Sequence, residues 1–135
     1  AVTETNHIYV NAGVYSRAPF IRNVFPNYQN VLSNENLVNE KVEAFELGYR
    51  IRLPRATVDL NVYHTKWMDK TIISGPLLSA DGTEYRAFVR GLIETHDGIE
   101  LEFRTKPLPS LELGGLVSIG DWRWDNNVEA DILDE

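Results

Sequence analysis

The chain has 135 residues, of which 43% are hydrophobic and 24% are charged, a composition that suits one folded domain and excludes a disordered or collagen-like polymer. The net charge of −7 and the scattered positions of Lys and Arg argue against nucleic acid as a partner. Cysteine is absent, which argues against a disulfide scaffold and a thiolate metal site. Polar residues interrupt every apolar stretch before it reaches the ~20 residues of a spanning helix, so any membrane-spanning segment must be a strand.

Apolar and polar residues alternate with a period of two in five windows, which predicts an all-β, antiparallel meander of about five strands and no helix. In chain order these windows cover residues 8–15, 44–53, 57–65, 99–104 with a weaker extension back to 89, and 111–120. The apolar positions of the three clearest strands are Phe45, Leu47, Tyr49, Ile51, Val58, Leu60, Val62, Ile99, Leu101 and Phe103. Charged and small residues occupy the opposite face.

The predicted connections alternate in length. They are long over residues 17–40, short over 53–55, long over 68–86 and short over 106–110. Alternating lengths place both short turns at one end of the sheet, as in outer-membrane barrels, whose turns are tight on the periplasmic side and whose outer loops are long. Pro54, Pro107 and Pro109 suit turns because their missing N–H costs no ladder bond there.

A soluble antiparallel β-sandwich produces the same alternation and is the competing interpretation. Two features favour a barrel wall. The polar face keeps charged and small residues along its centre, as a water-filled or plugged lumen requires. Aromatic residues also gather near the predicted strand ends, namely Tyr15, Trp67, Trp122 and Trp124.

Residues 36–50 read Asn-Leu-Val-Asn-Glu-Lys-Val-Glu-Ala-Phe-Glu-Leu-Gly-Tyr-Arg. This stretch resembles a recurrent barrel segment of TonB-dependent outer-membrane receptors, in which an Asn-x-x-Leu-x-x-Glu-Lys loop leads into an aromatic-Glu-Leu-Gly-Tyr strand. Other stretches resemble further steps of the same barrels, in the same order: residues 15–19 (Tyr-Ser-Arg-Ala-Pro), 62–70, 98–102 (Gly-Ile-Glu-Leu-Glu) and 120–124. The resemblance therefore covers nearly the whole chain.

The resemblance implies a location in the cell outer membrane and a part in the TonB-dependent uptake of a siderophore, cobalamin, glycan or peptide. In such receptors a barrel of 22 strands surrounds a plug. Residues 1–135 contain neither a plug nor a TonB-contacting box, and we expect them to be an internal portion of such a barrel. The implied partners are the rest of the barrel, the plug, the TonB system and outer-membrane lipid, which the ten apolar positions would face. No cofactor is implied.

Candidate ligand contacts lie in the first long loop and near the C-terminal end. Phe20, Arg22 and Tyr28 belong to the loop, and exposed loops on a rigid scaffold commonly carry recognition. Trp122 and Trp124 lie two apart, so they share one strand face, either at the barrel rim or stacked on a sugar.

No motif predicts an enzyme. Glu100 and Glu102 have the spacing of a polar strand face, which explains them more simply than a glycosidase acid/base pair does. The three histidines lack the spacing of a metal site, and no nucleophile elbow or phosphate-binding loop occurs. The alternative to the receptor is a soluble β-sandwich binding module with carbohydrate as its candidate ligand, and we predict no catalytic or metal-binding residues in either case.

Overall fold

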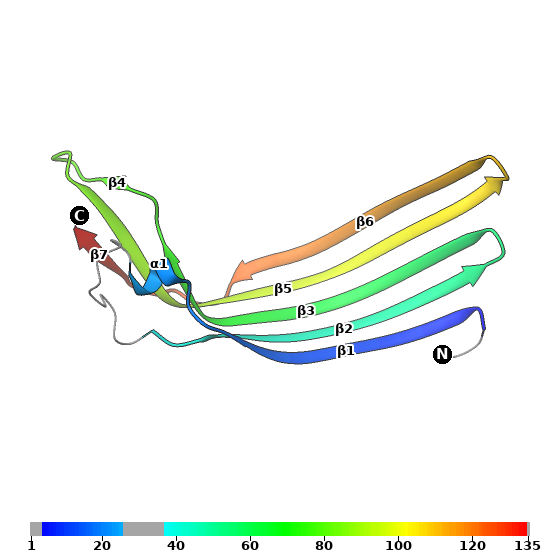
Figure 1. Cartoon of the computed structure of the whole chain (residues 1–135), viewed down its shortest axis with the longest axis horizontal. Coiled ribbons are helices and arrows are strands. Elements are labelled where there is room, and N and C mark those ends of the chain that lie inside the picture. Colours follow the sequence, from blue (N-terminus) through cyan, green and yellow to red (C-terminus); the bar gives the residue numbers. More distant parts are fainter. Residues whose placement is uncertain (1–3, 26–36, 135) are drawn as a thin grey trace. The chain divides into compact units, whose positions relative to one another are not determined.

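The computed structural model describes residues 4–25 and 37–134, and most of them lie in β-strands (Figure 1). In chain order the elements are β1 (Asn6–Arg17), α1 (Ile21–Val24), β2 (Glu40–Leu53), β3 (Ala56–Ile73), β4 (Leu77–Leu78), β5 (Glu84–Leu108), β6 (Leu111–Trp124) and β7 (Ala130–Asp134). The strands form an antiparallel sheet of seven strands that is not closed within the described part of the chain. The prediction of an all-β antiparallel fold is confirmed, and the number of strands exceeds the five predicted.

The sheet is a meander with additional pairing on β5. The strand order is β1-β2-β3-β5-β4, and β6 and β7 also pair with β5. The N-terminal part of β5 lies between two short strands: Tyr85 is opposite Leu77 of β4 and opposite Asp134 of β7, and Val89 is opposite Ala130. This arrangement is possible because β5 is 25 residues long and uses different segments for different partners.

Both predicted short turns are present. Pro54 and Arg55 connect β2 to β3, and Pro109 and Ser110 connect β5 to β6. The two turns lie at the same end of the strands that they join (Figure 1). The alternation of loop lengths was inferred from the prolines and the strand period alone. It therefore predicted the positions of both short turns correctly.

The predicted loop over residues 68–86 is wrong over much of its length. β3 continues to Ile73 and β5 begins at Glu84, with β4 between them. The physical reason is a change of phase within the strands: Asp69 has a φ of 58° and Gly91 a φ of 71°. A left-handed residue inside a strand shifts which side chains share a face, so the period of two breaks although the strand continues.

Two further elements were not predicted. α1 occupies part of the first long loop and is four residues long. β7 pairs with β5 through its backbone, in a segment whose side chains show little alternation. No helix in the described ranges is long and apolar enough to cross a membrane.

The chain divides into two compact units. Their described parts are residues 4–13, 43–66 and 95–123 for unit 1, and residues 14–25, 37–42, 67–94 and 124–134 for unit 2. Within the described residues, the only buried hydrophobic side chains are Val42 and Phe88, both in unit 2. Unit 1 thus holds its apolar side chains at the surface of the sheet instead of in an enclosed core.

Candidate functional site

The apolar positions predicted in unit 1 form an exposed sheet face. Eight of them are exposed, with Ile99 the most exposed at 51% and Tyr49 the least at 38%, and only Ile51 and Val58 are half-buried. The exposed members are Phe45, Leu47, Tyr49, Leu60, Val62, Ile99, Leu101 and Phe103. We call these ten positions, with the same-phase residues Leu53, Leu111, Leu113, Val117 and Ile119, the apolar face of unit 1.

The depth of the apolar face can be measured along two strands. It extends from Phe45 to Leu53 on β2 and from Leu111 to Ile119 on β6, where Gly115 alone interrupts it. At ~3.3 Å per residue, each span covers about 26 Å along the strand. A strand that crosses the hydrocarbon core of a membrane needs about 9–11 residues, so the two spans match that length.

The opposite face of unit 1 is polar and internally paired. The Tyr9 hydroxyl donates to Glu46 Oε1 at 3.2 Å, and Arg50 forms an ion pair with Asp59. The Tyr9 ring covers Gly48, where a Cβ atom would come within 1.9 Å of the ring. Glycine is therefore required beneath this aromatic side chain, which explains the small residue between the charged Glu46 and Arg50 on the polar face.

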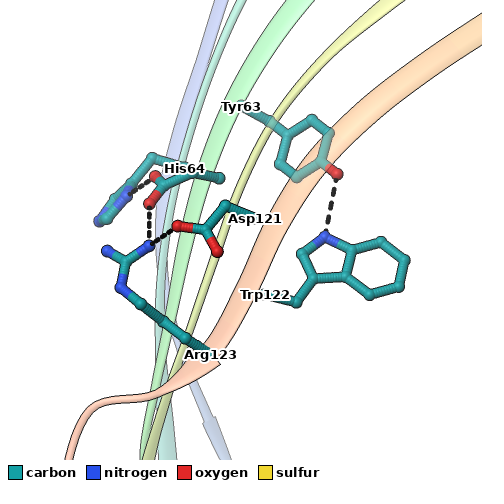
Figure 2. A network of polar contacts seen from close by, with 6 residues as sticks. Tyr63, His64, Asp121, Trp122 and Arg123 are labelled. Carbon is teal, nitrogen blue, oxygen red and sulfur yellow. Dashed lines mark hydrogen bonds and ion pairs between the residues drawn. The ribbon is translucent and has the colours of Figure 1, made fainter.

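Trp122 lies on this polar face beside Tyr63 (Figure 2). Its Nε1 donates to the Tyr63 hydroxyl at 3.3 Å, and its ring centroid is 5.4 Å from that of His96. The indole remains 68% exposed. The exposed Trp122 ring is therefore available to stack on a ligand.

A charged network marks the end of the apolar face. Asp97 accepts from His64 Nδ1 at 2.5 Å and from Arg123 Nη1 at 3.1 Å, and Arg123 also reaches Asp121 at 2.6 Å (Figure 2). His64 and Asp97 lie two residues from Val62 and Ile99, so they share the phase of the apolar face. The apolar face therefore ends in groups that require water or polar partners.

Unit 2 contains a cluster of ion pairs and tryptophans, which we call the cation–aromatic cluster: Arg17, Glu40, Trp67, Lys70, Glu94 and Trp124. Arg17 pairs with Glu40, whose side chain is only 2% exposed, and Lys70 pairs with Glu94. The Arg17 guanidinium lies 5.3 Å from the centre of the Trp67 ring, and Lys70 Nζ lies 5.6 Å from it. The left-handed Asp69 explains how side chains three residues apart on β3 meet on one side.

Two predicted contact residues belong to or border this cluster. The Phe20 ring, 52% exposed, lies 4.8 Å from the Arg17 guanidinium, and Trp124, 51% exposed, lies 5.4 Å from Lys70 Nζ. Arg22 is exposed on α1, which is fixed to β3 because the buried Asn23 donates from Nδ2 to the Thr71 carbonyl at 3.2 Å. Tyr28 lies outside the described residues.

The hairpin between β4 and β5 holds a second polar group of side chains. Asp81 accepts from the Thr83 backbone N–H at 3.1 Å and from the Ser79 hydroxyl. These hydrogen bonds, the Ser79 one first, lower the pKa of Asp81 from 3.8 to about 2. A cavity of about 450 Å³ lies beside it, lined by Ser79, Asp81, Thr83, Tyr85 and Ile132.

The sequence did not predict the partners within the cation–aromatic cluster. Glu94 pairs with Lys70, and Arg90 pairs with Asp131. These partners lie more than twenty residues apart, so only the strand register brings them together. The clustering of Trp67 and Trp124 near strand ends was the one signal available.

Comparison of the chain with protein-family models, with curated proteins and with solved structures finds no match. An inference about function therefore rests on the two faces of unit 1, on the cation–aromatic cluster of unit 2 and on the motif resemblance.

Proposed function

We propose that the chain is part of the wall of a TonB-dependent outer-membrane receptor that takes up a siderophore, cobalamin, glycan or peptide. The observation that carries the membrane part of this proposal is the exposed apolar face of unit 1, whose depth matches a hydrocarbon core. The receptor class rests on the motif resemblance, above all on residues 36–50. The proposed location is the cell outer membrane.

Backbone hydrogen bonding explains why such a wall needs partners. In hydrocarbon each unpaired N–H or C=O group costs several kcal/mol, so a spanning sheet must close on itself. The described strands leave the sheet open. In this proposal the remaining strands of the receptor complete the ring, membrane lipid covers the apolar face and the plug lies against the polar face.

The proposal assigns binding roles to side chains and no covalent chemistry. Trp122 on the polar face and Trp124 in the cation–aromatic cluster offer exposed indole surfaces, which suit planar or sugar-like parts of a ligand. Phe20 and Arg22 add an aromatic ring and a cation in the first long connection. Glu40 and Glu94 hold Arg17 and Lys70 in place against the Trp67 ring.

The alternative, a soluble β-sandwich binding module, requires a second sheet that covers the apolar face. The described residues form one sheet, so a sandwich would need its second layer from another part of a longer protein or from another chain. The two proposals differ in what contacts Leu47, Leu60 and Leu101, either lipid or protein.

The absence of native cysteine allows a direct test. Single cysteines replace Leu47, Leu60 or Leu101 in the full chain, and each is labelled with an environment-sensitive fluorophore. Matched controls carry the label one residue away, at Glu46, Asn61 or Glu100, on the opposite face. The labelled chains are reconstituted into vesicles that contain brominated lipid.

We expect lipid bromine to quench labels at the three leucine positions and to leave the three controls unaffected. Equal quenching of both sets would show that the chain lies on or in the bilayer without a defined face. Absence of quenching at all six positions, with a monomeric chain in plain buffer, would refute the membrane proposal and favour the sandwich.

A further inference from the structure

A row of alternating aromatic rings and cations runs along the cation–aromatic cluster of unit 2. The Arg17 guanidinium lies 4.8 Å from the centre of the Phe20 ring and 5.3 Å from the centre of the Trp67 ring. Lys70 Nζ lies 5.6 Å from the centre of the Trp67 ring and 5.4 Å from the centre of the Trp124 ring. We call the five side chains the aromatic row, in the order Phe20, Arg17, Trp67, Lys70 and Trp124.

The row lies on the polar side of its strands. Arg17 is separated by an even number of residues from Tyr9, and Trp67 from Tyr63, and both tyrosines belong to the polar face. The structure describes every residue between the members of each pair, and none of these residues has a positive φ. The strand phase is therefore unbroken, and both side chains lie on the side opposite to the apolar positions of their strands.

Both cations of the row are already paired with carboxylates. Arg17 pairs with Glu40, whose side chain is buried, and Lys70 pairs with Glu94, whose side chain is mostly buried. An incoming anion would leave a buried carboxylate without its cation, which is costly. The two cations and two carboxylates also have no net charge, so their field does not favour an anionic ligand. Together they offer both hydrogen-bond donors and acceptors.

The two ends of the row present exposed aromatic surface. Phe20 and Trp124 are each just over half exposed, whereas Trp67 in the middle is half-buried. The first turn of α1 holds the Phe20 backbone in place, because the Phe20 carbonyl accepts from the N–H groups of Asn23 at 2.8 Å and Val24 at 3.3 Å. Rings that are fixed before binding lose little conformational entropy when a ligand stacks on them.

These properties describe the ligand. It is neutral and long enough to reach several rings, it has apolar surfaces that pack on aromatic rings, and it carries groups that both donate and accept hydrogen bonds. A chain of sugars combines these features, because the C–H face of a sugar ring packs on an aromatic ring while its hydroxyls donate to carboxylates and accept from cations.

We propose that the aromatic row binds a neutral oligosaccharide, with sugar rings against Phe20 and Trp124 and hydroxyls at the Arg17–Glu40 and Lys70–Glu94 pairs. This inference rests on the ligand-binding part of the proposed function and narrows its ligand class to a glycan.

The test uses the full chain in lauryldimethylamine oxide, a detergent that contains no sugar. The probes are three neutral hexasaccharides, namely maltohexaose, cellohexaose and laminarihexaose. Hexagalacturonic acid serves as an anionic chain of the same length. Binding is measured by calorimetry and by NMR of the indole N–H groups, of which the chain has three.

The variants remove one exposed ring at a time. Trp124→Ala and Phe20→Ala each delete a ring at one end of the row, and Trp124→Phe keeps a ring there. The control is Phe45→Ala, which removes an exposed ring from the apolar face of unit 1. Circular dichroism checks that each variant keeps its strands. Phe20 lies outside the strands, so Phe20→Ala tests the site even if Trp124→Ala disturbs the end of β6.

We expect a neutral hexasaccharide to bind and to shift the Trp124 indole resonance at concentrations at which hexagalacturonic acid has no effect. Trp124→Ala and Phe20→Ala should each weaken binding about tenfold, Trp124→Phe should retain most of the affinity, and Phe45→Ala should not change it. Tighter binding of hexagalacturonic acid would overturn the assignment of a neutral ligand. Absence of binding by all three neutral chains, or unchanged affinity in both alanine variants of the row, would overturn the site itself.

Failure of this inference can be told apart from failure of the proposed function. If the labels at Leu47, Leu60 and Leu101 are quenched by lipid while no neutral hexasaccharide binds, the membrane-spanning proposal stands and the glycan site falls. If those labels are not quenched while a hexasaccharide binds at the row, the membrane proposal falls and the site remains, as part of a soluble binding module.

Discussion

The phenol ring of Tyr63 lies over Gly98 on the neighbouring strand, and a Cβ atom at residue 98 would come within 2.3 Å of Tyr63 Cζ. We predict that Gly98→Val displaces the ring, breaks the hydrogen bond from Trp122 Nε1 to the Tyr63 hydroxyl and costs about 1 kcal/mol. The Trp122 indole N–H resonance reports the change directly, and urea unfolding reports the free energy.

Gly75→Val is the matched control, because a Cβ atom at residue 75 meets no heavy atom within 4 Å. It should leave the Trp122 resonance and the unfolding midpoint unchanged. An unaltered Trp122 resonance in Gly98→Val would mean that the ring does not cover the glycine.

Glu40 is 1% exposed and depends on Arg17 as its ion-pair partner. We predict that Arg17→Met leaves this carboxylate buried without a cation and lowers the free energy of unfolding by about 2 kcal/mol. That estimate lies between the ~0.5 kcal/mol of exposed pairs and the ~4 kcal/mol of buried ones, because the Arg17 side chain is 43% exposed. Urea unfolding followed by tryptophan fluorescence measures it.

The double variant Arg17→Met with Glu40→Leu separates the ion pair from packing. Removing both charges should restore part of the stability that Arg17→Met loses, because no unpaired carboxylate then remains buried. Additive losses from the two single changes would show that the pair contributes no coupling. Lys41→Met, at an exposed position of the same strand, should have little effect.

The faces of unit 1 were predictable because each strand there keeps one period. From Phe45 to Leu53 and from Ile99 to Phe103, every second side chain is apolar. Eight of the ten predicted apolar positions are exposed on the sheet face, and the other two, Ile51 and Val58, are half-buried. Prolines at the turns fixed the strand ends. Period and turn chemistry are local properties, so a single sequence contains them.

The cation–aromatic cluster of unit 2 was not predictable in the same way. The left-handed Asp69 brings Trp67 and Lys70 to one side, which contradicts a strict alternation. The pairs of Arg17 with Glu40 and of Lys70 with Glu94 then depend on the register between strands. Register is set by the summed fit of whole strands, so individual residues do not reveal it.

Asp81 lies in the hairpin between β4 and β5, outside the proposed membrane-spanning segments, and its pKa is lowered from 3.8 to about 2. Because the folded value lies below the unfolded one, its stabilising effect is fully present above about pH 4 and is lost as the pH falls through about 2. We predict that the carboxyl ¹³C resonance of Asp81 titrates with a midpoint near 2.

The Ser79 hydroxyl is the largest cause of this shift, so Ser79→Ala should raise the Asp81 midpoint toward its ordinary value. Ser74→Ala removes a hydroxyl that bonds the Ala87 backbone N–H instead and should leave the midpoint where it is. Equal Asp81 midpoints in the two variants would mean that the hydrogen bond from the Ser79 hydroxyl to the Asp81 carboxylate is not formed in solution.

The Asn126 side chain makes hydrogen bonds to the β5 backbone that a neighbouring strand would otherwise make, at the point where β5 departs from regular strand conformation. Its Nδ2 donates to the Gly91 carbonyl and its Oδ1 accepts from the Ile93 backbone N–H, both at 2.8 Å, beside a glycine with a φ of 71°. Asn126→Ala removes both partners, so we predict faster hydrogen exchange at the Ile93 amide and a loss of about 1–2 kcal/mol in the free energy of local opening. Asn127→Ala, at the adjacent exposed residue, should change neither. Unchanged exchange at Ile93 in Asn126→Ala would show that water satisfies this amide as well as the side chain does, and Asn126 would then have no role in holding the irregular segment of β5.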